Sequence, residues 1–255
     1  MNTNVCISNE IKKKLFDYVA AYHTASFITD DPVQFPHRYV NKTDIEISAF
    51  IASWLAYGNR KSFIKVLNII HKDFIPSPTD YIKSKHYQHY ENDFSSLYRF
   101  YKKNDFFSLC SVLSDIYSNN QSMEDDIKKY INEKTFENVL KYFNIKFQNV
   151  NGIPKDNKSA CKRLCMLLRW LVRKEGDVDL GIWNILTPSQ LIIPVDTHVY
   201  QVAKNLNITN RNVVDMKTAE QITKFLLQIF PNDPCLGDFA LFGFGVEPTK
   251  YYMQK

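Results

Sequence analysis

Residues 191–202 read Leu-Ile-Ile-Pro-Val-Asp-Thr-His-Val-Tyr-Gln-Val, an apolar run followed by an amphipathic stretch. The apolar positions after the run have the i, i+3, i+4, i+7 spacing of a helix with one buried face; they are Val199, Val202, Ala203 and Leu206. Asp196 stands at or just before the first turn of this predicted helix. A carboxylate there either caps free backbone N–H groups or faces a ligand that docks at the helix end.

The rest of the chain has the same helical periodicity, with few of the alternating segments that are typical of strands. Asp44 is expected to cap a helix that runs to about Tyr57, and Gly58 and Asn59 separate it from a second helix. Further helices are expected over 106–117, 123–147, 159–173, 197–206 and 238–245, with the clearest loop at 148–157. The sequence therefore predicts an all-α protein.

Residues 81–107 are dense in aromatic side chains, most of which we expect in the core, with stacking on a nucleobase as the alternative for any one of them. They include Tyr87, Tyr90, Phe94, Tyr98, Phe100, Tyr101, Phe106 and Phe107.

Composition limits the class of protein. The chain has 255 residues, 45% of them hydrophobic, and a net charge of +5, which mildly favours a polyanionic partner. Its five cysteines are odd in number and scattered, and no signal peptide or membrane-length apolar run is present. We expect a reduced, cytoplasmic protein that is not in a membrane. The glycine motifs of dinucleotide-binding proteins, P-loop proteins and serine hydrolases are missing.

A basic stripe is predicted on the helix over 159–173, opposite its leucines. It consists of Lys158, Lys162, Arg169 and Arg173. Such a stripe is by default a solvated helix face. Its position shortly before Asp196 makes contact with phosphates the alternative.

The segment Pro194-Val195-Asp196-Thr197-His198-Val199 resembles the (L/V)PVDTHV segment of the helix-hairpin-helix DNA glycosylases, the superfamily of endonuclease III and oxoguanine glycosylase. The resemblance implies a catalytic role for the aspartate, which would stabilise the sugar cation as the base leaves. His198 would contact phosphate or substrate if it is not structural. In members that also cut the strand, a lysine forms a Schiff base with the sugar.

The family's hairpin and its lysine correspond to residues 151–164, Asn-Gly-Ile-Pro-Lys-Asp-Asn-Lys-Ser-Ala-Cys-Lys-Arg-Leu, a degenerate match in which most hairpin glycines are missing. Direct alignment makes Lys158 the nucleophile. Lys162 is the alternative, and we favour it because it lies within an established helix, a more rigid platform for chemistry.

Other blocks extend the resemblance to an uncharacterised bacterial branch related to these glycosylases; they are 161–173, 178–199 and 238–245. Residues 49–59 resemble the family's opening helix pair, whose turn faces DNA and here contains Asn59. Only Cys235 stands where some members hold an iron–sulfur cluster, so no cluster is expected. His86 and His89 have no second pair of ligands beside them, so no metal is expected either.

The resemblance implies a two-lobed helix-hairpin-helix fold, with residues 40–173 as one lobe and residues 1–39 and 174–255 as the other. The expected function is removal of a damaged base from double-stranded DNA by a monomeric N-glycosylase, with or without lyase activity, and the lesion we expect is an oxidised purine. Arg163, Arg169 and Arg173 would contact phosphates. The alternative is a non-catalytic nucleic-acid binder that keeps the fold, and a third hypothesis is a protein-interaction module.

Overall fold

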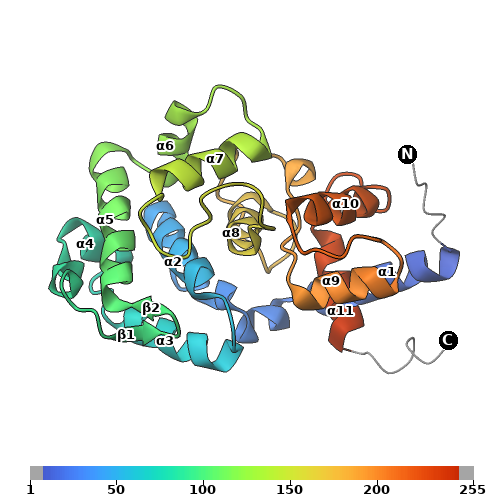
Figure 1. Cartoon of the computed structure of the whole chain (residues 1–255), viewed down its shortest axis with the longest axis horizontal. Coiled ribbons are helices and arrows are strands. Elements are labelled where there is room, and N and C mark those ends of the chain that lie inside the picture. Colours follow the sequence, from blue (N-terminus) through green and yellow to red (C-terminus); the bar gives the residue numbers. More distant parts are fainter. Residues whose placement is uncertain (1–7, 247–255) are drawn as a thin grey trace.

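The computed structural model describes residues 8–246, which form a mainly helical protein with one short β-hairpin (Figure 1). The predicted all-α class is confirmed. The α-helices are α1 (Asn9–Tyr22), α2 (Lys42–Leu55), α3 (Arg60–Lys72), α4 (Pro78–Lys83), α5 (Lys103–Asn119), α6 (Met123–Tyr130), α7 (Phe136–Lys146), α8 (Lys162–Val172), α9 (Thr197–Asn205), α10 (Met216–Leu227) and α11 (Leu236–Val246). The short 3₁₀ helices are η1 (Ala25–Asp30), η2 (Pro32–Gln34), η3 (Pro36–Arg38), η4 (His86–Tyr90) and η5 (Pro188–Gln190).

Helix α2 lies at the centre of the larger part of the molecule, where it is buried from Asp44 to Leu55 and packs against α3, α4 and α8. It begins earlier than predicted, with Asn41 at the cap position, so the expected cap role of Asp44 is wrong. Asp44 instead accepts a hydrogen bond from the backbone N–H of Thr79 at 2.9 Å. This contact fixes the start of α4 against α2.

Two other predicted helices have different limits. The helix expected over 123–147 is two helices, because Thr135 caps α7 by accepting from the N–H of Asn138. The helix expected from residue 159 begins at Lys162. Ser159 forms an isolated β-bridge with Asp215, and the carbonyl of Lys158 accepts from the N–H of Met216 at 3.0 Å, so these residues are extended instead.

The hairpin consists of strands β1 (Ser96–Tyr98) and β2 (Tyr101–Lys102), joined by Arg99 and Phe100. Most of the aromatic residues of segment 81–107 are buried or half-buried, as predicted. Phe94 and Phe100 are the exceptions among the eight named above, at 61% and 79% exposed.

The first and last described helices meet in the smaller part, where α1 packs on α11 and α11 packs on α9 (Figure 1). Helix α8 lies between this part and the part that contains α2. The lobe boundaries at residues 39 and 173 stay a prediction, and Cys6 lies outside the described residues. Within residues 8–246, no helix combines the length and the apolar character that crossing a bilayer requires.

Candidate functional site

Asp196 is the N-cap of α9. The buried residues Ile193 and Val195, which belong to no helix or strand, lead the chain to this point. One carboxylate oxygen, Oδ1, accepts hydrogen bonds from the backbone N–H groups of His198 and Val199 at 2.9 and 3.0 Å. Because a single oxygen satisfies the helix end, the second oxygen is available for another partner.

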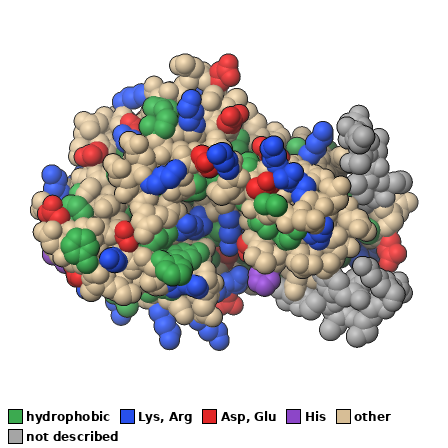
Figure 2. All heavy atoms as spheres, viewed as in Figure 1, with side chains coloured by type: hydrophobic (Ala, Val, Ile, Leu, Met, Phe, Trp, Pro, Cys, Tyr) green, Lys and Arg blue, Asp and Glu red, His purple; other side chains and the backbone are tan. Residues whose placement is uncertain are grey.

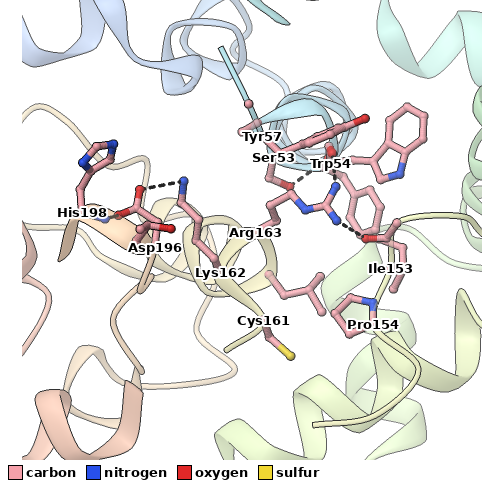
Figure 3. A pocket seen from close by; sticks show the side chains of 16 residues that line it. Ser53, Trp54, Tyr57, Ile153, Pro154, Cys161, Lys162, Arg163, Asp196 and His198 are labelled. Atoms are coloured by element: carbon pink, nitrogen blue, oxygen red, sulfur yellow. Dashed lines mark hydrogen bonds and ion pairs between the residues drawn. The ribbon is translucent and has the colours of Figure 1, made fainter. Parts of the chain in front are cut away.

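That partner is Lys162, the first residue of α8. Its Nζ lies 3.3 Å from Asp196 Oδ2, and the two side chains are 34% and 33% exposed (Figure 3). Cys161, in the left-handed conformation at φ 46°, turns the chain immediately before α8. An amine and a carboxylate from separate helices therefore meet at a position that solvent and a ligand can reach.

The electrostatic balance at Asp196 favours the ionised form. Burial alone would raise the pKa of Asp196, but the charge of Lys162 and the hydrogen bond from the Val199 N–H together outweigh it. The net pKa of Asp196 is below its ordinary value. The carboxylate is therefore negatively charged at neutral pH, as stabilisation of a developing cation requires.

The pair separates two neighbouring cavities of about 350 and 290 Å³. Both are lined by Tyr57, Lys162, Asp196 and His198. The larger cavity continues between the end of α2 and the loop before α8; its other lining residues include Phe50, Trp54, Gly152, Ile153, Pro154 and Arg163. The smaller cavity reaches α11; its lining includes Phe27, Asp31, Arg60, Phe239 and Asp238.

Arg163 forms the opposite wall of the larger cavity from Asp196 (Figure 3). Its guanidinium donates to the carbonyls of Trp54 at 2.7 Å and Gly152 at 2.5 Å, and to the hydroxyl of Tyr101. It also lies 5.3 Å above the centre of the Tyr57 ring. These contacts fasten the end of α2 to the loop before α8, so Arg163 serves as a wall residue of the cavity.

The predicted basic stripe on a solvated helix face is wrong for Arg169 and Arg173, because their side chains are buried at 4% and 0% exposure. Arg169 Nη1 lies 2.6 Å from Asp238 Oδ2, and Arg173 Nε lies 2.8 Å from Asp233 Oδ2. Both guanidinium groups also pair with Asp179. Buried cations need such partners, and the charges of both arginines are balanced within the protein, although Arg169 also lines the smaller cavity.

Lys158 lies apart from the pair. Its side chain is 90% exposed, and its Nζ is 3.6 Å from Asp156 in a solvent-facing ion pair. It lines neither cavity. Of the two lysines that the sequence left open, Lys162 is thus the one that contacts Asp196.

The two remaining predicted site residues also differ in whether they line the cavities. Asn59 is the N-cap of α3, where its Oδ1 accepts from the N–H of Ser62 at 3.0 Å, and it is exposed beside the cavities without lining them. His198 is exposed and lines both cavities. Its imidazole can therefore meet a ligand that contacts Asp196.

Asp238, a second carboxylate that lines the smaller cavity, was not among the residues predicted from the sequence. Burial raises its pKa to about 6, against the opposing effect of Arg169. One signal was present in the sequence: Asp238 is the single charged residue of the apolar segment Leu-Gly-Asp-Phe-Ala-Leu-Phe-Gly-Phe-Gly-Val over 236–246. A carboxylate that remains in so apolar a helix needs a partner or a function.

Within residues 8–246, no group of three or more histidine, cysteine or acidic side chains is placed to hold a metal ion. His86 is occupied locally, since its Nδ1 lies 2.7 Å from the hydroxyl of Ser84. The Nδ1 of His89 lies 2.7 Å from the carbonyl of His86.

Comparison with known proteins gives one family relationship. Searches of curated proteins and of solved structures found no significant match. A family model described as "Protein of unknown function (DUF2400)" matches residues 31–247, which include α2, α8, α9, the larger cavity and all of the smaller cavity's lining except Phe27. The match covers well over half of the sequence, so this chain belongs to the DUF2400 family.

Proposed function

We propose that the protein is a DNA N-glycosylase of the helix-hairpin-helix type that removes a damaged base, with lyase activity through Lys162. The observation that carries the proposal is the 3.3 Å approach of Lys162 Nζ to Asp196 Oδ2 at the boundary of two cavities. Helices α7 and α8 are joined by a loop, and Lys162 is the first residue of α8. This arrangement supports the proposed helix-hairpin-helix type.

Asp196 supplies the charge that the reaction needs. Breaking an N-glycosidic bond builds positive charge on the sugar, and a fixed carboxylate stabilises that charge. Because its other oxygen is held by two N–H groups of α9, Asp196 keeps its orientation as the charge develops. It also lies close enough to accept a proton from the Lys162 ammonium.

Lys162 supplies the nucleophile. Its free amine attacks the anomeric carbon, the new C–N bond replaces the glycosidic bond, and the base leaves with the bonding electron pair and takes up a proton. Opening of the C–O bond of the sugar ring then gives a Schiff base between Lys162 and the sugar. Water hydrolyses this intermediate, or loss of a C2′ proton expels the 3′ phosphate.

The larger cavity has the size and lining that suit an extruded base. Its volume of about 350 Å³ lies within the range of roughly 300–1,000 Å³ that is typical of small-molecule sites. Tyr57, which lines the cavity, provides an aromatic ring on which a flipped base can stack. We propose an oxidised purine as the lesion to test first.

The alternative of a non-catalytic nucleic-acid binder is favoured by the loop before α8. Over residues 147–161 this loop contains a single glycine, Gly152, whose carbonyl is taken by Arg163. A loop with few glycines offers fewer close approaches of backbone N–H groups to phosphate. Under this alternative, DNA binding is retained and base release is absent.

Borohydride trapping tests the proposal. Duplex oligonucleotides with oxidised, alkylated and deaminated bases and an abasic site are incubated with the full-length protein and sodium borohydride, and covalent adducts are counted on denaturing gels. We expect an adduct with at least one substrate, its loss in Lys162→Gln, and its retention in Lys158→Gln. Lys158 is the matched control because it is the same residue type in the same segment, outside both cavities.

Four results would contradict the proposal in different ways. Base release without an adduct removes the lyase part alone. Equal trapping by the Lys162 and Lys158 variants removes Lys162 as nucleophile. Binding of duplex without release of any base favours the non-catalytic alternative, and salt-independent absence of DNA binding favours a protein-interaction module.

A further inference from the structure

Asp238 is a buried carboxylate for which the proposed base release has no role. It lies in the first turn of α11, is 7% exposed, and lines the smaller cavity together with Lys162 and Asp196. One of its oxygens, Oδ2, is held by Arg169 Nη1 at 2.6 Å. Within residues 8–246, no group donates a hydrogen bond to the other oxygen, Oδ1. This second oxygen can therefore contact a group that enters the cavity.

The smaller cavity lies where the larger and smaller parts of the molecule meet. Its lining includes Ala56 at the end of α2 and Arg60 at the start of α3, and it includes Val199 of α9 and Asp238 of α11. Figure 2 shows the surface hollowed between the two parts, with Lys and Arg side chains in the hollow. Cations there favour the approach of a sugar–phosphate chain.

Two buried carboxylates line this cavity, and their surroundings differ. The charges of Asp196 and Lys162 both act on Asp238 and shift its pKa in opposite directions. The positive charges that lower the pKa of Asp31 are those of two arginines instead. Asp238 is therefore the buried carboxylate of the smaller cavity whose charge is linked to the amine.

The lyase half of the proposed reaction needs a base that the ion pair does not supply. Once the Schiff base has formed, the Lys162 nitrogen is bonded to C1′ of the sugar and is no longer a free amine. Asp196 has a pKa below its ordinary value, which makes it a weak proton acceptor. Another group must take the proton from C2′ before the 3′ phosphate can leave.

The proton affinity of Asp238 suits this task. Burial raises the pKa of Asp238 to about 6, so the carboxylate is mostly ionised at neutral pH. It nevertheless binds a proton roughly a hundred times more tightly than a carboxylate whose pKa is below 3.8, as that of Asp196 is. Where two carboxylates in one site have pKa values moved apart, one can stabilise charge while the other transfers protons.

We propose that Asp238 is the base of the lyase step and removes the C2′ proton from the Schiff base between Lys162 and the sugar. C2′ is two bonds from Lys162 Nζ, and Lys162 and Asp238 line the same cavity. Arg169 holds the carboxylate by its other oxygen while the proton is transferred. The inference rests on the proposed glycosylase and lyase function.

The step balances without a further reactant. The C2′–H bond breaks, the proton passes to the Asp238 carboxylate, and the electron pair forms the C1′=C2′ double bond of an enamine as the nitrogen loses its positive charge. The nitrogen lone pair then re-forms the C=N bond, the C1′=C2′ pair moves to C2′=C3′, and the C3′–O bond breaks. The 3′ phosphate leaves with that bonding pair.

Separate measurements of adduct formation and strand cleavage test the role of Asp238. Wild type and Asp238→Asn are incubated with a duplex that contains an abasic site, and each reaction is followed with borohydride for the adduct and without it for cleavage. We expect Asp238→Asn to form the adduct within about threefold of the wild-type rate. Its cleavage should fall by about a hundredfold or more, which is the usual contribution of a general base.

The matched control is Asp31→Asn. Asp31 is a buried carboxylate of the same cavity, at 8% exposure, and its Oδ1 accepts from the N–H of Val33 at 3.0 Å, a contact that asparagine can keep. This variant should form the adduct and cleave the strand as wild type does. Asp238→Glu, which keeps a carboxylate, should recover part of the cleavage that Asp238→Asn loses.

The pH dependence of wild type gives a readout that needs no variant. Protonated Asp238 cannot act as a base, so the rate of cleavage relative to adduct formation should fall as pH is lowered through about 6. The charged and titratable groups that share the cavity with Asp238 are Asp31, Arg60, Lys162, Arg169, Asp196 and His198. Because histidine can titrate in the same range, His198→Gln is measured too and should keep this pH dependence.

The outcomes separate the role of Asp238 from the proposed function. An unchanged ratio of cleavage to adduct in Asp238→Asn, or no fall in the wild-type ratio near pH 6, overturns the role and leaves the glycosylase intact. Equal losses of adduct and cleavage also overturn it, because Asp238 would then act on the structure of the site. A wild-type protein that forms no adduct with any substrate overturns the lyase function itself, and this inference with it.

Discussion

Lys162 and Arg163 are consecutive in the chain, yet their side chains point to opposite walls of the larger cavity (Figure 3). Lys162 reaches Asp196 before α9, whereas Arg163 binds the carbonyls of Trp54 and Gly152. Successive residues of a helix are about 100° apart around its axis, so the first turn of α8 places one side chain on each wall of the cavity. The position of the amine therefore depends on the same turn that holds α2 to the loop.

Replacing Asp196 separates its cap role from its charge. Asparagine caps helices as well as aspartate does, so Asp196→Asn should lose only the stability that the ion pair with Lys162 contributes, whereas Asp196→Ala should lose about 1 kcal/mol more with the cap. Urea titration followed by circular dichroism measures both. Base release should be absent in both variants. An Asp196→Asn variant that keeps wild-type activity would contradict the proposed role of the carboxylate.

The stability contributed by Asp196 should depend on pH. Its pKa is lower in the folded protein than its ordinary value of 3.8, so the unfolded state binds more protons near and below that pH. The contribution is therefore fully present above about pH 5 and is lost as pH falls through the folded pKa. The difference in unfolding free energy between wild type and Asp196→Asn should shrink as pH is lowered from about 5 to about 3. A difference that grows over this interval would mean that the pKa is raised instead.

Arg173 should matter for stability and not directly for DNA contact. Arg173→Met leaves the buried carboxylates of Asp179 and Asp233 without this partner, which should cost about 3–5 kcal/mol in unfolding free energy. Lys158→Met, at an exposed cation, should change it by less than about 0.5 kcal/mol. Chemical denaturation of the two variants makes the comparison. Equal effects would show that the buried network contributes little.

Gly152 should be intolerant of a side chain. It has φ +82°, and a Cβ would overlap the hydroxyl oxygen of Tyr101, which Arg163 contacts. Gly152→Ala should therefore cost at least about 1–3 kcal/mol and deform the larger cavity. Gly245→Ala is the control, because its Cβ would make an ordinary 3.7 Å contact with Val202 on a helix. Thermal unfolding that ranks the two variants equally would show that the loop absorbs the added methyl group.

Helix α3 should determine the salt dependence of DNA binding if the proposed function holds. Lys61 and Lys65 are exposed on it, and removal of each phosphate-binding cation should reduce the slope of log K against log salt by about 0.9. Fluorescence anisotropy with the double variant Lys61→Gln, Lys65→Gln measures the change. Lys141→Gln on α7, at the opposite edge of the molecule in Figure 1, should keep the wild-type slope. An unchanged slope in the double variant would place the duplex elsewhere.

Local sequence rules recovered much of the fold. Apolar spacing identified the helices, and Asp196 occupies the helix start that its context predicted, because a cap depends on residues within one turn. Helix limits were less accurate where a distant segment intervened. The bridge between Ser159 and Asp215 delays α8, and no local pattern near residue 159 contains that information.

The sequence by itself determined that the chain is helical and that a carboxylate stands at the start of α9, since both follow from interactions between near neighbours. Only the tertiary structure decided which lysine contacts Asp196 and which arginines are buried. The partners of Arg169 and Arg173 come from the segment after α8 and from residues near α11. A helical periodicity gives the direction of a side chain around its own axis, but the charge it meets there depends on how distant helices pack.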